Sequence, residues 1–222
     1  YQLKKGAFSF TPSDHISRLA LHLRLVDLHV ALYYGRGSFK RAAQTWVDDV
    51  KKRAWYKKER DIIHLDGFVK EQDFNKRWKE LDDALENKYA QGSAIKEMRV
   101  FQHSFKGKAT TPAGVEFANG ELSLPEIKAL AKLKWKDRAI LVMHGCNTAL
   151  KGENRPWIPA EEFHKRLGVE TWGTPGYSYF SKERGTYDRI DRKSYPIYLW
   201  AFKRGKNSVF GSGARMASVK FK

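Results

Sequence analysis

The sequence predicts an α/β protein, with a mostly parallel sheet flanked by helices and preceded by a helical N-terminal region. Two observations lead to this prediction. The first ninety residues contain long amphipathic segments with apolar side chains at three- and four-residue steps, which is typical of helices. After Gly92, short apolar runs alternate with helical segments, which is typical of a sheet with helices on its faces. We therefore expect a helical region over residues 1–92 and an α/β domain over residues 93–222.

Three helices are expected in the first region, over residues 13–34, 38–60 and 70–91. Ser13 and Ser38 stand where a helix N-cap is expected. The run "DIIHLDGF" between the second and third segments predicts a short apolar turn or strand.

The second region predicts a strand, a helix and a second strand in succession. "EMRVFQH" and "RAILVMHG" are short apolar runs bounded by turn signals, as in strands buried in a sheet. Between them, "SLPEIKALAKLKW" offers Ser123 as a cap and Pro125 for the first turn of a helix. A further helix is expected from Pro159 to Gly168, followed by strands in "VETWGTPG" and "YPIYLWAFKRG".

Composition excludes several function classes. The chain has 222 residues, 41% of them hydrophobic, and its apolar stretches are too short for a transmembrane segment, so we expect a soluble protein. A single cysteine excludes an intramolecular disulfide and a cysteine-rich zinc site. The chain has no Walker loop, no dinucleotide fingerprint and no HExxH motif. We expect no cofactor and no metal site.

The net charge of +17 favours an anionic partner, and nucleic acid, an anionic membrane surface and an acidic protein all qualify. Basic residues concentrate in residues 36–60 and 182–222. The first of these segments also suits an amphipathic helix with solvated lysines, whose apolar side would contain Trp46, Trp55 and Tyr56. We favour this helix over a surface that binds phosphates and stacks bases.

Cys146 is the candidate nucleophile, because it follows a buried strand and Gly145 permits a sharp turn there. A thiol needs a base to become a thiolate near neutral pH, and histidine is the usual one. His103 ends the strand that precedes the connecting helix, and consecutive parallel strands end at the same edge of a sheet. His144, two residues before the cysteine, and His64 are alternative bases, and a purely structural role for the cysteine also stays open.

The run from "HSFKGK" through "NGELSLPEIKAL" to "HGCNTAL" resembles the caspase-like cysteine peptidases, most closely their CHAT branch. The resemblance covers roughly residues 97–181. It implies that Cys146 is the nucleophile and His103 the base, with Ser104 standing where the family usually has a glycine.

We therefore expect a cysteine hydrolase that acts on a peptide or amide bond of a peptide or protein substrate. Backbone N–H groups around Gly145 and Cys146 would hold the oxyanion. The basic charge and an N-terminus without an initiator methionine suggest a bacterial effector or toxin module, delivered or secreted as part of a larger polypeptide. Two alternatives remain: a papain-like or NlpC/P60-like cell-wall amidase that uses His64, and a basic nucleic-acid-binding or nuclease domain in which the cysteine is structural.

Overall fold

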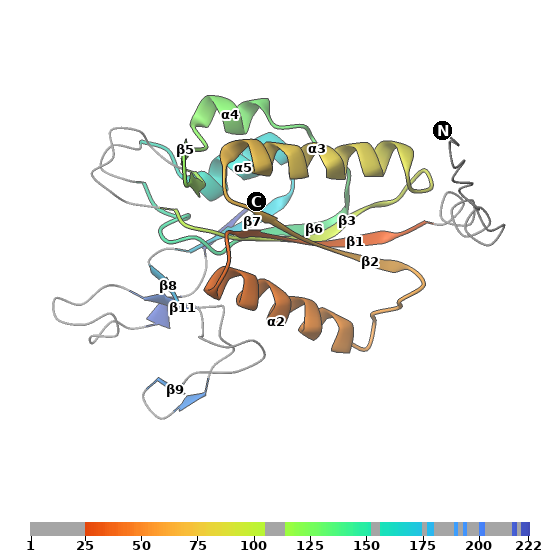
Figure 1. The fold of residues 1–222 in the computed structure, drawn as a ribbon, viewed down its shortest axis with the longest axis horizontal. Coiled ribbons are helices and arrows are strands. Elements are labelled where there is room, and N and C mark those ends of the chain that lie inside the picture. Colours follow the sequence, from red (N-terminus) through yellow and green to blue (C-terminus); the bar gives the residue numbers. More distant parts are fainter. Residues whose placement is uncertain are drawn as a thin grey trace, which may run out of the picture.

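The centre of the protein is a six-stranded sheet (Figure 1). The structure is a computed structural model that describes residues 25–104, 114–151, 156–174, 177–179, 189–190, 193–194, 200–202, 215–216 and 219–222. Across the sheet the strands follow in the order β13 (Val219–Phe221), β7 (Glu170–Gly173), β6 (Trp135–Met143), β3 (Ala94–Phe101), β1 (Asp27–Tyr34) and β2 (Asp61–Phe68). Only β13 is antiparallel to its neighbour. The predicted α/β class with a mostly parallel sheet is confirmed.

Helices cover both faces of the sheet (Figure 1). On one face lies α2 (Ser38–Lys52), and on the other lie α3 (Glu71–Asn87), α4 (Leu124–Ala129) and α5 (Pro159–Leu167). The larger core fills the α3, α4 and α5 side, with Phe74, Trp78 and Phe163 fully buried. A smaller core lies under α2, around Trp46 and Phe101.

Short strands lie outside this sheet. β4 (Glu116–Phe117) pairs with β5 (Gly120–Glu121), and β9 (Arg189–Ile190) pairs with β10 (Lys193–Ser194). A three-stranded antiparallel sheet contains β8 (Tyr177–Tyr179), β11 (Trp200–Phe202) and β12 (Arg215–Met216). The strand expected in "YPIYLWAFKRG" is described only over β11, and most of the basic C-terminal segment lies outside the described residues.

The expectation of a helix over residues 13–34 is wrong for residues 27–34, which form β1 inside the sheet. Leu28, Val30 and Leu32 face the larger core, whereas Ala31 belongs to the core under α2. A strand that is buried on both faces has no polar side, so its apolar residues also satisfy three- and four-residue steps. Pairing with β2 and β3 decides the outcome, and residues 27–92 are therefore not a helical region apart from the sheet.

The later elements agree with the sequence more closely. "DIIHLDGF" forms β2, α3 lies inside the expected segment, and Ser123 caps α4 through a capping box with Glu126. Gly168 ends α5 in the left-handed conformation, at φ 67°. The exception is α2, which ends at Lys52 and not near Arg60 because Arg53 takes an extended conformation.

None of the helices in the described ranges combines the length and the apolar character that a membrane-spanning helix needs.

Candidate functional site

His103 and Cys146 lie at the same edge of the sheet. β3 and β6 pair in parallel, and the last pair of their register joins Val100 to Met143. Each candidate comes three residues after its member of that pair. The adjacency that the sequence predicts for these two residues therefore agrees with the strand pairing.

The two side chains line one pocket of about 520 Å³ at this edge. The other lining residues come from the end of β1, the start of α2, the end of β3 and β8: Tyr34, Arg36, Gly37, Ser38, Phe39, Gln102 and Ser178. The thiol is partly exposed and the imidazole is exposed, so a molecule in this pocket reaches both groups.

Hydrogen bonds hold the loop that carries the cysteine on two sides. The Thr148 hydroxyl lies 3.1 Å from the carbonyl oxygens of Met143 and Gly145, and it accepts the N–H of Thr174 at 2.8 Å. The N–H of Ala149 donates to the Thr174 carbonyl at 3.1 Å. The loop is thus fixed to the end of β6 and to the residue that follows β7.

Gly145 is required here by close packing. A Cβ at this position would lie 2.8 Å from the Cβ of Ser104 and 3.1 Å from the Cγ of Gln102. The missing side chain lets the loop approach the residues that flank His103. Ser104 therefore takes part in this packing at the position where the resemblance leads one to expect a glycine.

The Cys146 thiol is a weak acid in this environment. Burial raises its pKa above the ordinary value, and the negative charge of Glu116 adds to the increase. Backbone N–H groups act in the opposite direction: the Ser178 N–H donates to Sγ at 3.4 Å, and the N–H of Cys146 itself also lowers the pKa. The protonated thiol is therefore favoured, although two backbone N–H groups partly offset the effect of burial.

Two aromatic rings hold His103. Phe39 packs edge to face at 4.6 Å between ring centroids, and Tyr34 does so at 5.4 Å. The backbone of His103 forms a bridge to Glu116, whose N–H donates to the His103 carbonyl at 3.0 Å. These contacts hold the imidazole in the lining of the pocket without burying it.

His144, the second candidate base, is buried on the α2 side. Its ring stacks on Phe101 at 4.6 Å, and its Nε2 lies 3.3 Å from Nη1 of Arg99. A guanidinium only donates, so Nε2 accepts and the neutral ring carries its proton on Nδ1. Burial and the nearby Arg99 charge hold the pKa of His144 well below its usual range. Its nitrogen that faces Arg99 is therefore engaged, and its basicity is low.

His64, the third candidate, lies far from the thiol. Its Nε2 is 3.1 Å from the Tyr89 hydroxyl, and burial lowers its pKa. It belongs to β2, which β1 and β3 separate from β6. With about 4.8 Å between neighbouring strands, the backbone of His64 is roughly 14 Å from β6. The structure does not bring His64 and Cys146 together.

Sequence reasoning missed several residues of this pocket. Tyr34 precedes and Phe39 follows the glycine-rich turn at the end of β1, and the expected helix over residues 13–34 concealed that strand end. Ser178 contributes a backbone N–H, which no side-chain pattern reveals. The carboxyl end of β1 would have drawn attention to both rings had the strand been recognised.

Comparisons with models of known protein families, with curated proteins and with solved structures found no match for this chain. Within the described part of the chain, no group of three or more His, Cys, Asp or Glu side chains is arranged to hold a metal ion.

Proposed function

We propose that the protein is a cysteine hydrolase that acts on a peptide or amide bond, with Cys146 as nucleophile and His103 as base. One observation supports this most strongly. The single cysteine and an exposed histidine follow adjacent parallel strands and line the same pocket at the carboxyl edge of the sheet. The resemblance of this segment to caspase-like peptidases of the CHAT branch assigns the same two residues.

In the proposed reaction the thiol stays protonated until a substrate occupies the pocket, since burial raises its pKa. His103 then takes the thiol proton as Sγ attacks the carbonyl carbon, and it returns that proton to the leaving amine. The N–H groups of Ser178 and Cys146 stabilise the thiolate as it forms. Water completes the cycle by hydrolysing the thioester, with His103 again as base.

The oxyanion needs backbone donors close to Sγ, and Gly145 and Cys146 remain the candidates for them. The tight packing of Gly145 against Ser104 and Gln102 supports this proposal, because it fixes the orientation of the peptide units on both sides of Gly145. A role as a bacterial effector or toxin is a proposal about the biological setting of this chemistry.

The papain-like alternative with His64 receives no support from the geometry. His64 is engaged with Tyr89 and belongs to a strand that is not a neighbour of β6. The residues after Cys146 form a turn held by Thr148, whereas in a papain-like enzyme we expect a long helix that begins at the nucleophile.

The experiment that tests the proposal measures alkylation of Cys146 by iodoacetamide across pH, in the wild type and in the variants His103→Ala, His144→Gln and His64→Ala. We expect the rate at neutral pH to fall about tenfold or more in His103→Ala alone, because only that variant loses the proposed base. If Cys146 is alkylated at the same rate and with the same pH dependence in all four proteins, the proposed mechanism is wrong.

Hydrolysis of a mixed peptide library, read by mass spectrometry, provides the matching activity assay. Cys146→Ala should abolish cleavage, and His103→Ala should lower the rate about 10²- to 10⁴-fold, the usual contribution of a general base. His64→Ala is the control and should cleave at the wild-type rate. Loss of cleavage in His64→Ala with activity retained in His103→Ala would favour the papain-like alternative.

A further inference from the structure

A second group of charged side chains lies at the opposite edge of the sheet, where the parallel strands begin. The segment from Lys51 to Arg60 connects α2 to β2 at this edge (Figure 1). It contains six basic residues and one acidic residue, Glu59. We call residues 51–60, together with Lys96 and Lys136 from the starts of β3 and β6, the basic edge.

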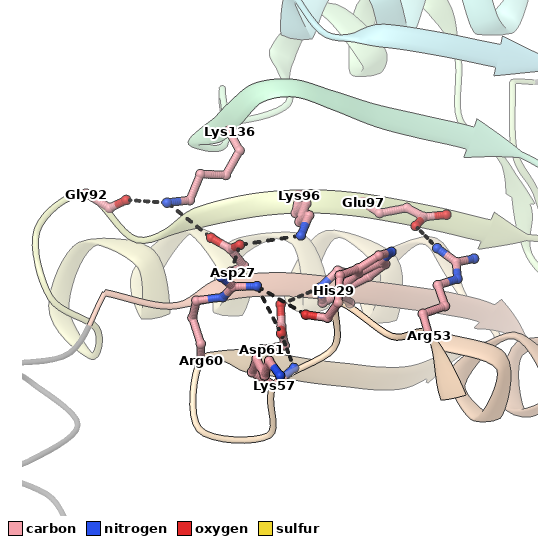
Figure 2. A network of polar contacts seen from close by, with 11 residues as sticks. Asp27, His29, Arg53, Lys57, Arg60, Asp61, Gly92, Lys96, Glu97 and Lys136 are labelled. Atoms are coloured by element: carbon pink, nitrogen blue, oxygen red, sulfur yellow. Dashed lines mark hydrogen bonds and ion pairs between the residues drawn. The ribbon is translucent and has the colours of Figure 1, made fainter. Parts of the chain in front are cut away.

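A buried carboxylate, that of Asp61, fixes the shape of this segment from its inner side (Figure 2). Asp61 is fully buried, accepts the backbone N–H of Lys57 at 2.6 Å and lies 3.5 Å from Nη2 of Arg60. Its other oxygen accepts a hydrogen bond from Nε2 of His29 at 3.1 Å. Asp61 therefore organises the backbone of the turn, and its charge points inward.

Asp27 links the starts of the strands through ion pairs. Its carboxylate lies 3.1 Å from Nζ of Lys136, 3.6 Å from Nζ of Lys96 and 3.7 Å from Nε of Arg60. One anion thus gathers three cations from three different elements, as Figure 2 shows. The cluster keeps an excess of positive charge.

Trp55 contacts two cations, Lys96 again and Arg53. Nζ of Lys96 lies 4.1 Å from the centre of its ring and the guanidinium of Arg53 lies 5.5 Å away, both as cation–π contacts. The indole also stacks on His29 at 5.2 Å and is 37% exposed. Trp55 lies outside α2, so the expectation that it belongs to the apolar side of that helix is wrong.

The outward side chains of this edge are not neutralised. Lys51, Lys52, Lys57 and Lys58 are exposed, and none of their ammonium groups forms an ion pair with a residue of the described ranges. Asp27 and Asp61 thus form ion pairs on the inner side of this edge, while the four exposed lysines have no carboxylate partner among the described residues. Such an arrangement suits a partner that brings closely spaced negative charges.

We propose that the basic edge binds the phosphate backbone of a nucleic acid, at a surface distinct from the pocket of Cys146. Lysine side chains that neutralise phosphates release condensed counterions, and this release favours binding regardless of sequence. A membrane surface fits less well, because Trp55 is the only large apolar side chain exposed in the 51–60 segment and two cations already lie against its ring.

The test compares two variants with the same change in net charge. The first replaces Lys51, Lys52, Lys57 and Lys58 by Gln; the second replaces Lys76, Lys79, Lys128 and Lys132, which are exposed on and beside α3 and α4 in the opposite layer. The probe is a fluorescent DNA duplex of about 20 base pairs, titrated over a series of salt concentrations. Vesicles of phosphatidylserine and phosphatidylcholine form a parallel assay.

We expect the first variant to weaken DNA binding about tenfold or more and to reduce the salt slope of log Kd by about one for each lysine that contacts a phosphate. The second variant should bind nearly as the wild type does. Equal losses in both variants would overturn the proposal in favour of non-specific attraction by net charge. Binding to vesicles but not to DNA would overturn it in favour of a membrane partner.

Alkylation of Cys146 is measured on the same proteins. The proposal expects it to be unchanged in both lysine variants, because the basic edge and the pocket lie at opposite ends of the strands. A fall in alkylation in the first variant alone would show that the two surfaces are not distinct, and would overturn that part of the proposal.

Discussion

Each end of the parallel strands holds a histidine, and the two environments are opposite. At the amino end, His29 and Asp61 form a pair in which both side chains are fully buried (Figure 2). At the carboxyl end, His103 is exposed and lines a pocket with Cys146. A histidine beside a carboxylate is a familiar catalytic arrangement, yet here that pair lies where solvent cannot reach it.

The comparison shows one histidine, His29, that stabilises the fold and another, His103, that is accessible to a ligand. Nε2 of His29 donates to Asp61, and Nδ1 is buried without a hydrogen-bond partner in the described structure. Burial lowers the pKa of His29 more than Asp61 raises it. His103 instead has aromatic contacts that orient its ring and leave its nitrogens available to the pocket. The His29–Asp61 pair thus contributes to stability, whereas His103 stays accessible.

We expect the largest effect from a substitution that breaks the His29–Asp61 pair. Asp61→Ala removes the acceptor of the buried Nε2 of His29 and of the Lys57 N–H, and it leaves the His29 donor unsatisfied in the interior. We expect a loss of about 3 kcal/mol in the free energy of unfolding, measured by urea denaturation.

The matched change at the other end is His103→Ala, which should alter the free energy of unfolding by about 0.5 kcal/mol or less, as is usual for an exposed side chain. Comparable losses in the two variants would contradict the distinction between the two ends.

The next effect concerns packing at the candidate site. Gly145→Ala places a Cβ 2.8 Å from the Cβ of Ser104, which is too close, so we expect a loss of about 2 kcal/mol in stability. The double variant Ser104→Gly with Gly145→Ala removes that contact and should lose less than the sum of the two single changes. Strictly additive losses, again from urea denaturation, would indicate that this contact is not the source of the effect.

The sequence predicted the half of the molecule that determines the candidate site better than the half that precedes it. The strand, helix and strand from Ala94 to Met143 have a clear order of apolar runs and caps, so the adjacency of His103 and Cys146 followed from topology alone. β1 was mistaken for a helix because it is apolar on both faces. Consequently Tyr34 and Phe39, which depend on where β1 ends, could not be foreseen.

The choice among the histidines also needed the structure. Sequence spacing places His144 close to Cys146, but only packing shows that its ring lies between Phe101 and Arg99. The pairing of Arg99 with Glu97, at 2.7 Å, joins residues of one strand that no motif connects. Burial of charged groups is decided by the tertiary structure, and this is where local pattern carries least information.

The smallest effect for a single residue is a change in how stability depends on pH. The pKa values of His29, His64 and His144 are lowered in the folded protein, mainly by burial. Below about pH 6.5 the unfolded chain therefore binds protons that the folded chain does not, and the free energy of unfolding falls as the pH decreases. Each such histidine contributes a slope of at most about 1.4 kcal/mol per pH unit.

His144→Gln should therefore flatten the stability profile between about pH 6.5 and 5, since the folded-state pKa of His144 is lowered most clearly. Urea denaturation at a series of pH values gives the slopes of the wild type and of the variant. A profile as steep in His144→Gln as in the wild type would contradict the assignment of His144 as a buried histidine with a lowered pKa.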